Sequence, residues 1–489
     1  MAGTRSTNLW LTRDAFLRRS AAGALALGTG GFAPRLVADA IASPLAGPAN
    51  VHRFRSRPDI VTPMLVVRQK HAGRSAGHLF IAPNSGPGHR GPLLLDDDGQ
   101  PVWFRNTRPV VTMNFRAAVY RGKPVLTWWE GKSRNGLGHG THVVVDDSYR
   151  ELMRVPAGNG RPADLHEFII TSRGTALVTA WEQSVADLSA VGGPSGGRVI
   201  GGVVQELELP SGRVLFEWRS LDHVDVAESY QPWSPRGAYD YFHVNSVELD
   251  RDGNLLVSAR NTWTVYKVDR ESGDVIWRLG GKKSDFQMGN GTGFAWQHDA
   301  RRHGGSEYLI SLFDDGASPT VQPQSKGLVL KLDQTARRAT LHRRYTHYPN
   351  VLSRALGSVQ VMPNSNVLVG WGTAPFITEY RSDGKVLWDA ELPEGAENYR
   401  ALRLPWTGRP WRKPDAVVEY MKGHHFIYAS WNGATELARW RLTSKLATTF
   451  HARTGFETEI VAPYGVKTVM LTPVDAKDAP LHPGLELRV

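Results

Sequence analysis

The chain has 489 residues, of which 41% are hydrophobic and 21% are charged. It is longer than one ordinary domain, and its apolar content excludes a disordered chain. The absence of cysteine excludes disulfides, thiolate metal sites and a cysteine nucleophile. The 50 glycines and 30 prolines favour a turn-rich β protein. The net charge is +11, but no long Lys/Arg run occurs beyond the leader, which favours anionic small-molecule ligands over nucleic acid.

The beginning of the chain has the pattern of an export signal. A charged segment at residues 12–19 (TRDAFLRR) precedes an apolar stretch at residues 20–32, and AIA at residues 40–42 resembles a signal-peptidase site. The charged segment resembles a twin-arginine leader, except that Asp14 stands in the second arginine position. We expect residues 1–42 to be a cleaved signal peptide, and the protein to be exported to the cell envelope or beyond, with no stable membrane insertion. An uncleaved membrane anchor is the alternative.

One short pattern recurs along the middle of the chain: an apolar strand, a polar turn, and a second strand that often ends in tryptophan. Period-2 alternation and the turn residues predict that each copy is a β-hairpin. The spacing of roughly 50–65 residues is typical of propeller blades with loop insertions. The six copies are residues 93–104 (LLLDDDGQPVWF), 143–155 (VVVDDSYRELMRV), 204–218 (VQELELPSGRVLFEW), 265–279 (VYKVDRESGDVIWRL), 329–345 and 377–392 (ITEYRSDGKVLWDAEL).

A second hairpin precedes five of these copies, so two hairpins make a four-stranded blade. The sixth innermost strand is expected at residues 398–406, and its partners lie upstream, at residues 78–83 and 93–104. Such closure removes free sheet edges. We therefore predict an all-β protein whose six-bladed β-propeller is closed by strands from both ends of the chain.

The predicted propeller occupies residues 77–412 and follows an N-terminal extension at residues 43–76. Residues 416–489 lack the repeat and consist of short alternating strands. This texture predicts a small C-terminal β-sandwich domain, immunoglobulin- or fibronectin-like. Two acidic runs, at residues 96–98 and 314–316, are predicted to be turns.

Alignment of the repeats places different residues at equivalent positions around the centre of the predicted propeller. The position at the start of the innermost strand holds Phe115, His166, His243, His298, Gly357 and Tyr399. The position at the end of the neighbouring strand holds Trp129, Trp181, Arg260, Phe313, Gly372 and Pro83. Innermost strands line the central channel, so we expect the three histidines to converge with Arg260 beside them. Neither set of positions contains a carboxylate.

This combination of side chains distinguishes between kinds of site. Three histidines could bind zinc or copper, but Arg260 would repel a metal ion. An arginine among imidazoles suits a tetrahedral oxyanion such as sulfate, with one histidine as nucleophile and another as proton donor. We therefore expect neither a metal nor a cofactor. The alternatives are hydrogen-bonded core histidines, and blade packing for the aromatic residues.

Four motifs around these residues resemble those of the bacterial arylsulfotransferases, which use no nucleotide sulfate donor. They are residues 164–167 (DLHE), 242–246 (FHVNS), 258–261 (SARN) and 296–299 (WQHD). The resemblance covers roughly residues 54–412 and implies a six-bladed propeller with His298 as the sulfated nucleophile. His243, Arg260 and His166 correspond to the family's other essential residues.

The implied reaction moves a sulfuryl group from an aryl sulfate to a phenol through a sulfohistidine. His243 and His166 would exchange protons with the two phenols. The residues expected to bind the substrate are Trp129, Trp181, Phe313, Tyr399 and Asn245. One alternative is a metal-dependent lactonase-like propeller, although such sites use Asp, Asn and Glu at the centre. The other is a non-enzymatic exported propeller that binds cell-surface polymers or partner proteins.

Overall fold

The computed structural model describes residues 50–489 except residue 306. The predicted signal peptide at residues 1–42 lies outside these residues. The only helical segments described are three single turns of 3-10 helix, Ser189–Val191, Ser220–Asp222 and Val226–Glu228. No helix in this part of the chain has the length and apolar character required to cross a membrane. The protein is all-β, as predicted.

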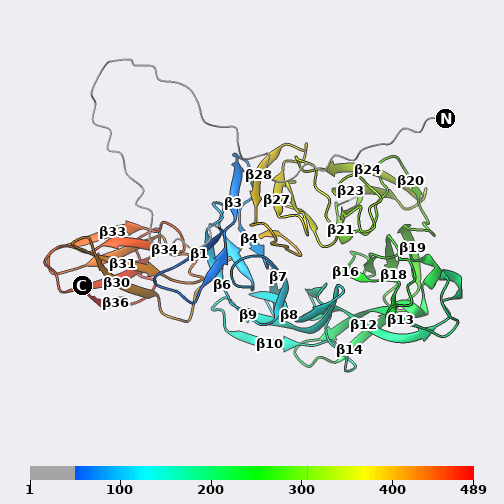
Figure 1. Ribbon diagram of the computed structural model, residues 1–489, viewed down its shortest axis with the longest axis horizontal. Helices are drawn as coiled ribbons and strands as arrows, with labels where there is room; N and C mark the ends of the chain where they lie inside the picture. The colour runs from blue at the N-terminus through cyan, green and yellow to red at the C-terminus, as the bar shows by residue number, and fades with distance from the viewer. Residues whose placement is uncertain (1–49, 306) are drawn as a thin grey trace, which may run out of the picture. The chain divides into compact units, whose positions relative to one another are not determined.

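Five sheets in the described chain each contain four strands that follow one another in sequence and pair antiparallel (Figure 1). The first is β7 (Val111–Tyr120), β8 (Lys123–Arg134), β9 (Leu137–Asp146) and β10 (Glu151–Val155). The second is β11 (Phe168–Ile170), β12 (Thr175–Ala186), β13 (Gly197–Glu208) and β14 (Val214–Arg219). The third is β16 (Val244–Leu249), β17 (Leu255–Ala259), β18 (Thr264–Val268) and β19 (Val275–Gly280).

The other two sheets of this kind follow the same order. They are β21 (His298–His303), β22 (Tyr308–Asp314), β23 (Lys326–Asp333) and β24 (Arg338–Tyr345), then β25 (Ser358–Val361), β26 (Val367–Gly370), β27 (Phe376–Tyr380) and β28 (Val386–Glu391). Short parallel strands, β15 (Tyr239–Asp240) and β20 (Gln287–Met288), extend two of the five. The predicted hairpins are confirmed, and the repeated sheets give a propeller-like fold.

A further sheet combines strands that are far apart in sequence. Its order is β29 (Leu402–Leu404), β4 (His78–Ile81), β5 (Leu93–Leu95) and β6 (Pro101–Phe104), with Leu402 opposite Phe80. The predicted pairing of a strand near residue 400 with strands upstream of residue 105 is therefore confirmed. It arises because the last innermost strand has no hairpin after it in the sequence.

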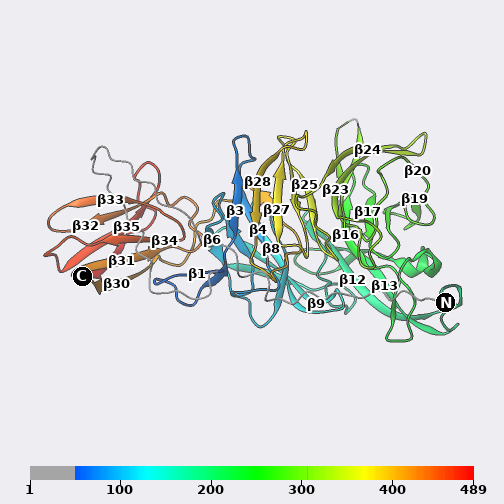
Figure 2. The same cartoon turned by 45° about the horizontal axis from the view of Figure 1, so that its top comes forward.

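One strand of the predicted N-terminal extension belongs to a propeller-like sheet. Strand β3 (Val66–Lys70) pairs antiparallel with β28, and Figure 2 shows the two side by side. Val67 packs against a core cluster that includes Trp388 and Ala390. The extension thus contributes a fifth strand to this sheet. Because β3 is a single strand without the repeated hairpin pattern, the repeat alignment does not find it.

The C-terminal segment forms two sheets that share one apolar core, which includes Ile427, Trp440 and Leu471. One sheet is β30 (Asp415–Met421), β31 (His424–Ser430) and β34 (Glu457–Val461). The other is β33 (Thr448–Ala452), β32 (Arg439–Thr443), β35 (Thr468–Val474) and β36 (Leu485–Arg488). The hairpin of β1 (Val51–Arg53) and β2 (Val61–Pro63) precedes β3. Between these two strands, the backbone N–H of Ser56 donates to the carboxylate of Glu457, which is in β34.

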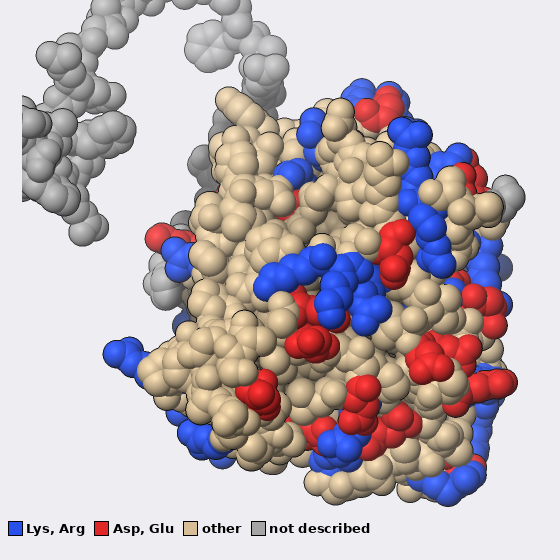
Figure 3. All heavy atoms as spheres, turned by 90° about the vertical axis from the view of Figure 1, so that its right-hand side faces the viewer, with Lys and Arg blue, Asp and Glu red and all other residues tan. Residues whose placement is uncertain are grey.

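The surface carries charges of both signs. On the face drawn in Figure 3, Lys and Arg side chains lie among Asp and Glu side chains. The acidic run at residues 96–98 forms the predicted turn, in which Asp96 Oδ1 accepts hydrogen bonds from the backbone of Asp98 at 3.0 Å and of Gln100 at 2.9 Å. The second predicted turn, at residues 314–316, has a different structure, which is described with the site.

Candidate active site

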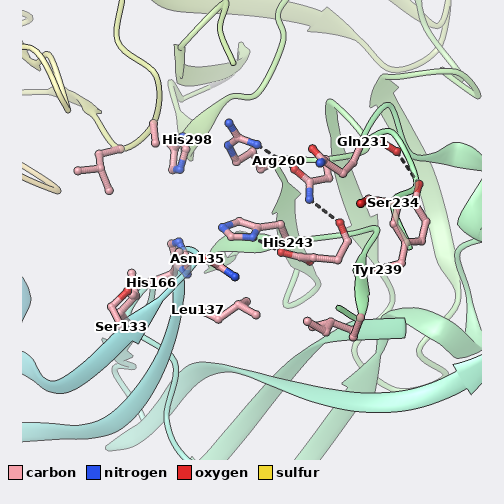
Figure 4. A pocket seen from close by; sticks show the side chains of 18 of the residues that line it. Ser133, Asn135, Leu137, His166, Gln231, Ser234, Tyr239, His243, Arg260 and His298 are labelled. Carbon is pink, nitrogen blue, oxygen red and sulfur yellow. Dashed lines mark hydrogen bonds and ion pairs between the residues drawn. The ribbon is translucent and has the colours of Figure 1, made fainter. Parts of the chain in front are cut away.

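Three histidines from three successive sheets come together with an arginine. The ring centroids of His166 and His243 lie 5.1 Å apart, and those of His166 and His298 lie 6.4 Å apart. These histidines and Arg260 line one cavity of about 420 Å³ (Figure 4). Figure 4 shows the imidazoles pointing toward one another. The structure thus brings together the four residues that the repeat alignment predicts to be catalytic.

The strands place these side chains at a common level. His166 lies two residues before β11, His243 directly precedes β16, and His298 is the first residue of β21. The backbone N–H of Arg260 donates to the carbonyl of His243 at 2.9 Å, so both residues belong to the same end of one sheet. His243 has a φ of 55°, in the left-handed region that non-glycine residues seldom adopt.

Each histidine has a carboxylate at Nδ1, a feature that the sequence analysis missed. The Nδ1–Oδ2 distances are 2.5 Å for His166 and Asp164, 2.5 Å for His243 and Asp240, and 2.7 Å for His298 and Asp315. A carboxylate at this nitrogen holds the N–H there and leaves Nε2 for chemistry. Each imidazole is therefore oriented and has its second nitrogen available.

The prediction of a turn at residues 314–316 is wrong for the two aspartates. Neither lies in a turn, and both are buried. Asp314 ends strand β22, and its Oδ1 accepts a hydrogen bond from the backbone of Ala295 at 3.0 Å. Asp315 pairs with His298. The equivalent positions of the repeats lack carboxylates, but the site itself has three, because each aspartate approaches from a neighbouring position. Asp164 and Asp240 precede their histidines by two and three residues, which is the signal that could have revealed them.

Burial controls the charge of two of the three histidines. It lowers the pKa of His298 well below the usual value of 6.5, and the nearby positive charge of Arg260 lowers it further. Burial also lowers the pKa of His166. Both imidazoles are therefore neutral near pH 7. The His243 side chain is less deeply buried than these two, and 10% of it is exposed.

The arginine is fixed by contacts on several sides. Its Nη1 donates to Asn261 Oδ1 at 3.0 Å, and its Nη2 donates to the backbone carbonyl of Arg354 at 3.2 Å. The guanidinium carbon lies 4.7 Å from the ring centroid of Trp296. A planar guanidinium held in this way can present parallel N–H groups to two oxygens of one anion.

A buried ion network lies next to the histidines. Arg400 Nη1 donates to Glu167 Oε1 at 2.8 Å, and Arg400 Nε lies 3.0 Å from Asp299 Oδ1. Burial alone would raise the pKa of Glu167, but three neighbouring guanidinium groups outweigh it and lower this pKa to about 2. Tyr399 directly precedes Arg400 in the sequence, and its hydroxyl donates to the carbonyl oxygen of His166 at 3.2 Å. The network thus supports the backbone that carries the site.

None of the five residues predicted to bind the substrate lines the cavity. Trp129 Nε1 donates to the carbonyl of Ala163, Trp181 Nε1 to Gly138, and Asn245 Nδ2 to Gln297, while Phe313 packs on Trp371 and Tyr399 contacts the backbone of His166. These side chains fill space between strands and satisfy backbone groups. Their places agree with packing, which was the alternative interpretation for the aromatic residues.

The cavity wall comes instead from strand and loop residues that the repeat alignment does not single out. Its apolar part includes Met113, Leu137, Leu165, Ile200 and Leu356. The turn between β8 and β9, Asn135-Gly136, has both φ angles positive, which is typical of an Asn-Gly hairpin turn. A Cβ at Gly136 would lie 2.9 Å from His243 Cε1, so the tip of this hairpin touches the site.

Comparison with known proteins identifies a family. A family model described as Arylsulfotransferase (ASST) matches residues 116–392, which include all four converging residues. No curated protein sequence matches the chain. Similar solved structures include a protein of unknown function from Bacteroides caccae, at 13% identity, a TM-score of 0.41, and coverage of 67% of this chain and 98% of that one. A streptogramin B lyase is similar at 9% identity and a TM-score of 0.35, covering 74% and 94% of the respective chains.

Proposed function

This chain belongs to the arylsulfotransferase family, and from that premise we propose that its histidine cluster moves a sulfuryl group from an aryl sulfate to a phenol through a sulfohistidine. Family membership supports arylsulfotransferase activity in general. The observation that carries the finer proposal is the pairing of buried His298 with Asp315, in a cavity that His298 shares with Arg260. A neutral imidazole with a free Nε2 is a nucleophile, and the guanidinium matches sulfuryl oxygens.

In the first half-reaction, Nε2 of His298 attacks the sulfur of the aryl sulfate. The N–S bond forms as the S–O bond to the aryl group breaks, and the electron pair of that bond leaves on the phenolate. Asp315 balances the positive charge that develops on the imidazole. Arg260 donates hydrogen bonds to the sulfuryl oxygens, where charge is spread in such transfers.

In the second half-reaction, a phenol takes the sulfuryl group from His298. Its hydroxyl proton passes to a neighbouring base, its oxygen bonds to sulfur, and the N–S bond returns its electrons to Nε2. His243 with Asp240 and His166 with Asp164 are the two acid–base pairs within reach of the cavity. The pair that acts begins the cycle as an imidazolium: its Nε2 proton passes to the leaving phenolate, and Nε2 later accepts the proton of the incoming phenol.

We further propose a propeller with six blades, a C-terminal sandwich and export of the protein. The six sheets that begin with β4, β7, β11, β16, β21 and β25 in chain order are the blades of a six-bladed propeller at residues 77–412, with β29 as the closing strand and β3 added to the last blade from the extension. The two C-terminal sheets, around their shared core, form a small sandwich at residues 416–489. The leader-like sequence at residues 1–42 supports export to the envelope or beyond. Aryl sulfate and phenol are the partners, and the chemistry requires neither a metal nor a cofactor.

The covalent step can be tested by mass spectrometry. Protein is mixed with a chromogenic aryl sulfate without acceptor, and an added mass of about 80 Da, that of SO₃, is sought on the peptide that contains His298. His298→Asn should show neither this adduct nor a burst of phenol. His303→Asn is a matched control, because His303 lies on the same strand but its Nε2 bonds to Ser311 at 2.7 Å. An adduct on His243, or full transfer by His298→Asn, would contradict the proposed role.

A further inference from the structure

One side of the cavity is formed by a loop that is anchored at both of its ends. Residues 231–238 of this loop include Gln231, Ser234 and Arg236, all of which line the cavity. Figure 4 shows Gln231 and Ser234 on the side of the cavity away from His298. The loop therefore contacts the part of a bound molecule that is remote from the reacting sulfur.

The anchors hold this loop in place. At one end, the Tyr230 ring stacks on Trp263 with centroids 3.7 Å apart, and the backbone N–H of Tyr230 donates to Asn261 at 2.7 Å. At the other end, Tyr239 pairs with Val199 of β13, and its hydroxyl donates to the carbonyl of Gln231 at 2.7 Å. A segment anchored this way presents its side chains with little loss of freedom on binding.

The charges of the cavity are unbalanced. Two arginines line it, Arg260 and Arg236, whereas Asp240 is its single carboxylate among the described lining residues and is already paired with His243. Arg236 is exposed and forms no ion pair with any residue that the structure describes. Arg260 serves the transferred sulfuryl group in the proposed reaction. Arg236 is thus a second cation that lines the same cavity, on the loop whose Gln231 and Ser234 lie away from His298, and it has no ion-pair partner among the described residues.

Part of the cavity wall is apolar. Leu137 and Ile200 are among the residues that line it. An aromatic ring can pack against such a wall while polar groups at its two ends meet the histidines and the rim. These residues suit a molecule with a reacting oxygen at the histidines, an aromatic ring, and an anion that reaches the loop bearing Arg236.

We propose that Arg236 makes this enzyme selective for phenols that carry a carboxylate at the end opposite the reacting hydroxyl. The inference rests on the proposed function and specifies its acceptor class. The carboxylate would accept two parallel hydrogen bonds from the guanidinium, an arrangement that is stronger and more directional than a neutral hydrogen bond. Arg236 is therefore a specificity-determining residue.

The test compares two acceptors that differ in one charge, 4-hydroxyphenylacetate and 4-hydroxyphenylacetamide, with a chromogenic aryl sulfate as donor. For the wild-type protein, kcat/KM for the acid should exceed that for the amide about tenfold, as expected for one charge-assisted contact at a partly exposed site. Arg236→Gln should bring the ratio of the two values close to one. Arg236→Lys, which keeps the charge and loses the fork, should give an intermediate ratio.

Arg198→Gln is the matched control. Arg198 is an exposed arginine on β13, the strand that also contributes Ile200, but it does not line the cavity, so its removal should leave the ratio at the wild-type value. Transfer to the amide by Arg236→Gln would show that this variant is folded. Equal wild-type rates with acid and amide, or a ratio that survives in Arg236→Gln, would overturn the selectivity and leave the transferase intact. No transfer to either acceptor would overturn both.

Discussion

Oδ2 of Asp315 lies 2.7 Å from Nδ1 of His298, although 17 residues separate them in the sequence. Both side chains are buried. His298 begins β21 and Asp315 directly follows β22, so the antiparallel pairing of these strands brings the two together. The carboxylate thereby fixes which imidazole nitrogen faces the cavity.

Asp315→Asn should lower kcat by about two to four orders of magnitude, because an amide no longer stabilises the imidazolium and allows the wrong tautomer. Steady-state rates with a chromogenic aryl sulfate and a phenol would measure the loss. Asp314→Asn is the control: its Oδ1 can still accept from Ala295, and it does not contact His298. An Asp315→Asn enzyme with wild-type kcat would show that the carboxylate has no part in orienting the nucleophile.

Arg260→Lys should slow both half-reactions by about two to three orders of magnitude, since a lysine keeps the charge but cannot present two parallel N–H groups. Rapid-mixing experiments would follow phenol release. A slow burst is expected here, in contrast to the absence of any burst in His298→Asn. A burst at the wild-type rate would exclude Arg260 from stabilising the sulfuryl group.

Gly136→Ala should reduce activity by crowding the site. Gly136 has a φ of 79°, and an added Cβ would lie 2.9 Å from Cε1 and 3.3 Å from Nε2 of His243. Gly122→Ala is a close control, because Gly122 also ends a two-residue hairpin turn, has a φ of 75°, and has nothing within 4 Å of an added Cβ. Both variants should lose about 1 kcal/mol of stability from backbone strain.

The difference between these two glycine variants therefore isolates the contact with the histidine. We expect kcat/KM to fall at least about tenfold in Gly136→Ala, since displacement of a catalytic group by a fraction of an ångström is costly. Gly122→Ala should retain its activity. Equal activities in the two variants would mean that the hairpin tip does not constrain His243.

Glu167→Gln should destabilise the protein by about 3 kcal/mol at neutral pH, because the ionised carboxylate is buried among guanidinium groups. The pKa of Glu167 is lowered from 4.5 to about 2 in the folded state. Its stabilisation is therefore complete above pH 4.5 and is lost as the pH falls toward 2. Denaturant midpoints of both proteins should converge over that range.

A control for this last effect is Glu307→Gln, which removes an exposed partner of Lys331 and should shift the midpoint little at any pH. Parallel pH dependence of wild type and Glu167→Gln between pH 5 and pH 2 would contradict the stabilising role of the ionised carboxylate.

The repeated hairpins, the pairing of residues near 400 with those near 80, and the four residues that meet in the cavity can all be predicted from the sequence alone. These features are periodic: alternation fixes the faces of a strand, and recurrence places His166, His243 and His298 at one level. The family motifs lie on the same residues, within the matched range 116–392.

The surroundings of these residues could not be predicted from the sequence and become clear in the folded chain. Asp315 reaches His298 through the pairing of β21 with β22. The Asn135-Gly136 turn belongs to one sheet and contacts His243, which belongs to another. Trp129 and Phe313, which the alignment places beside the histidines, pack between strands instead. Local sequence encodes strand and turn, whereas the contacts of a loop or a buried carboxylate depend on segments far away in the chain, whose approach is set by packing.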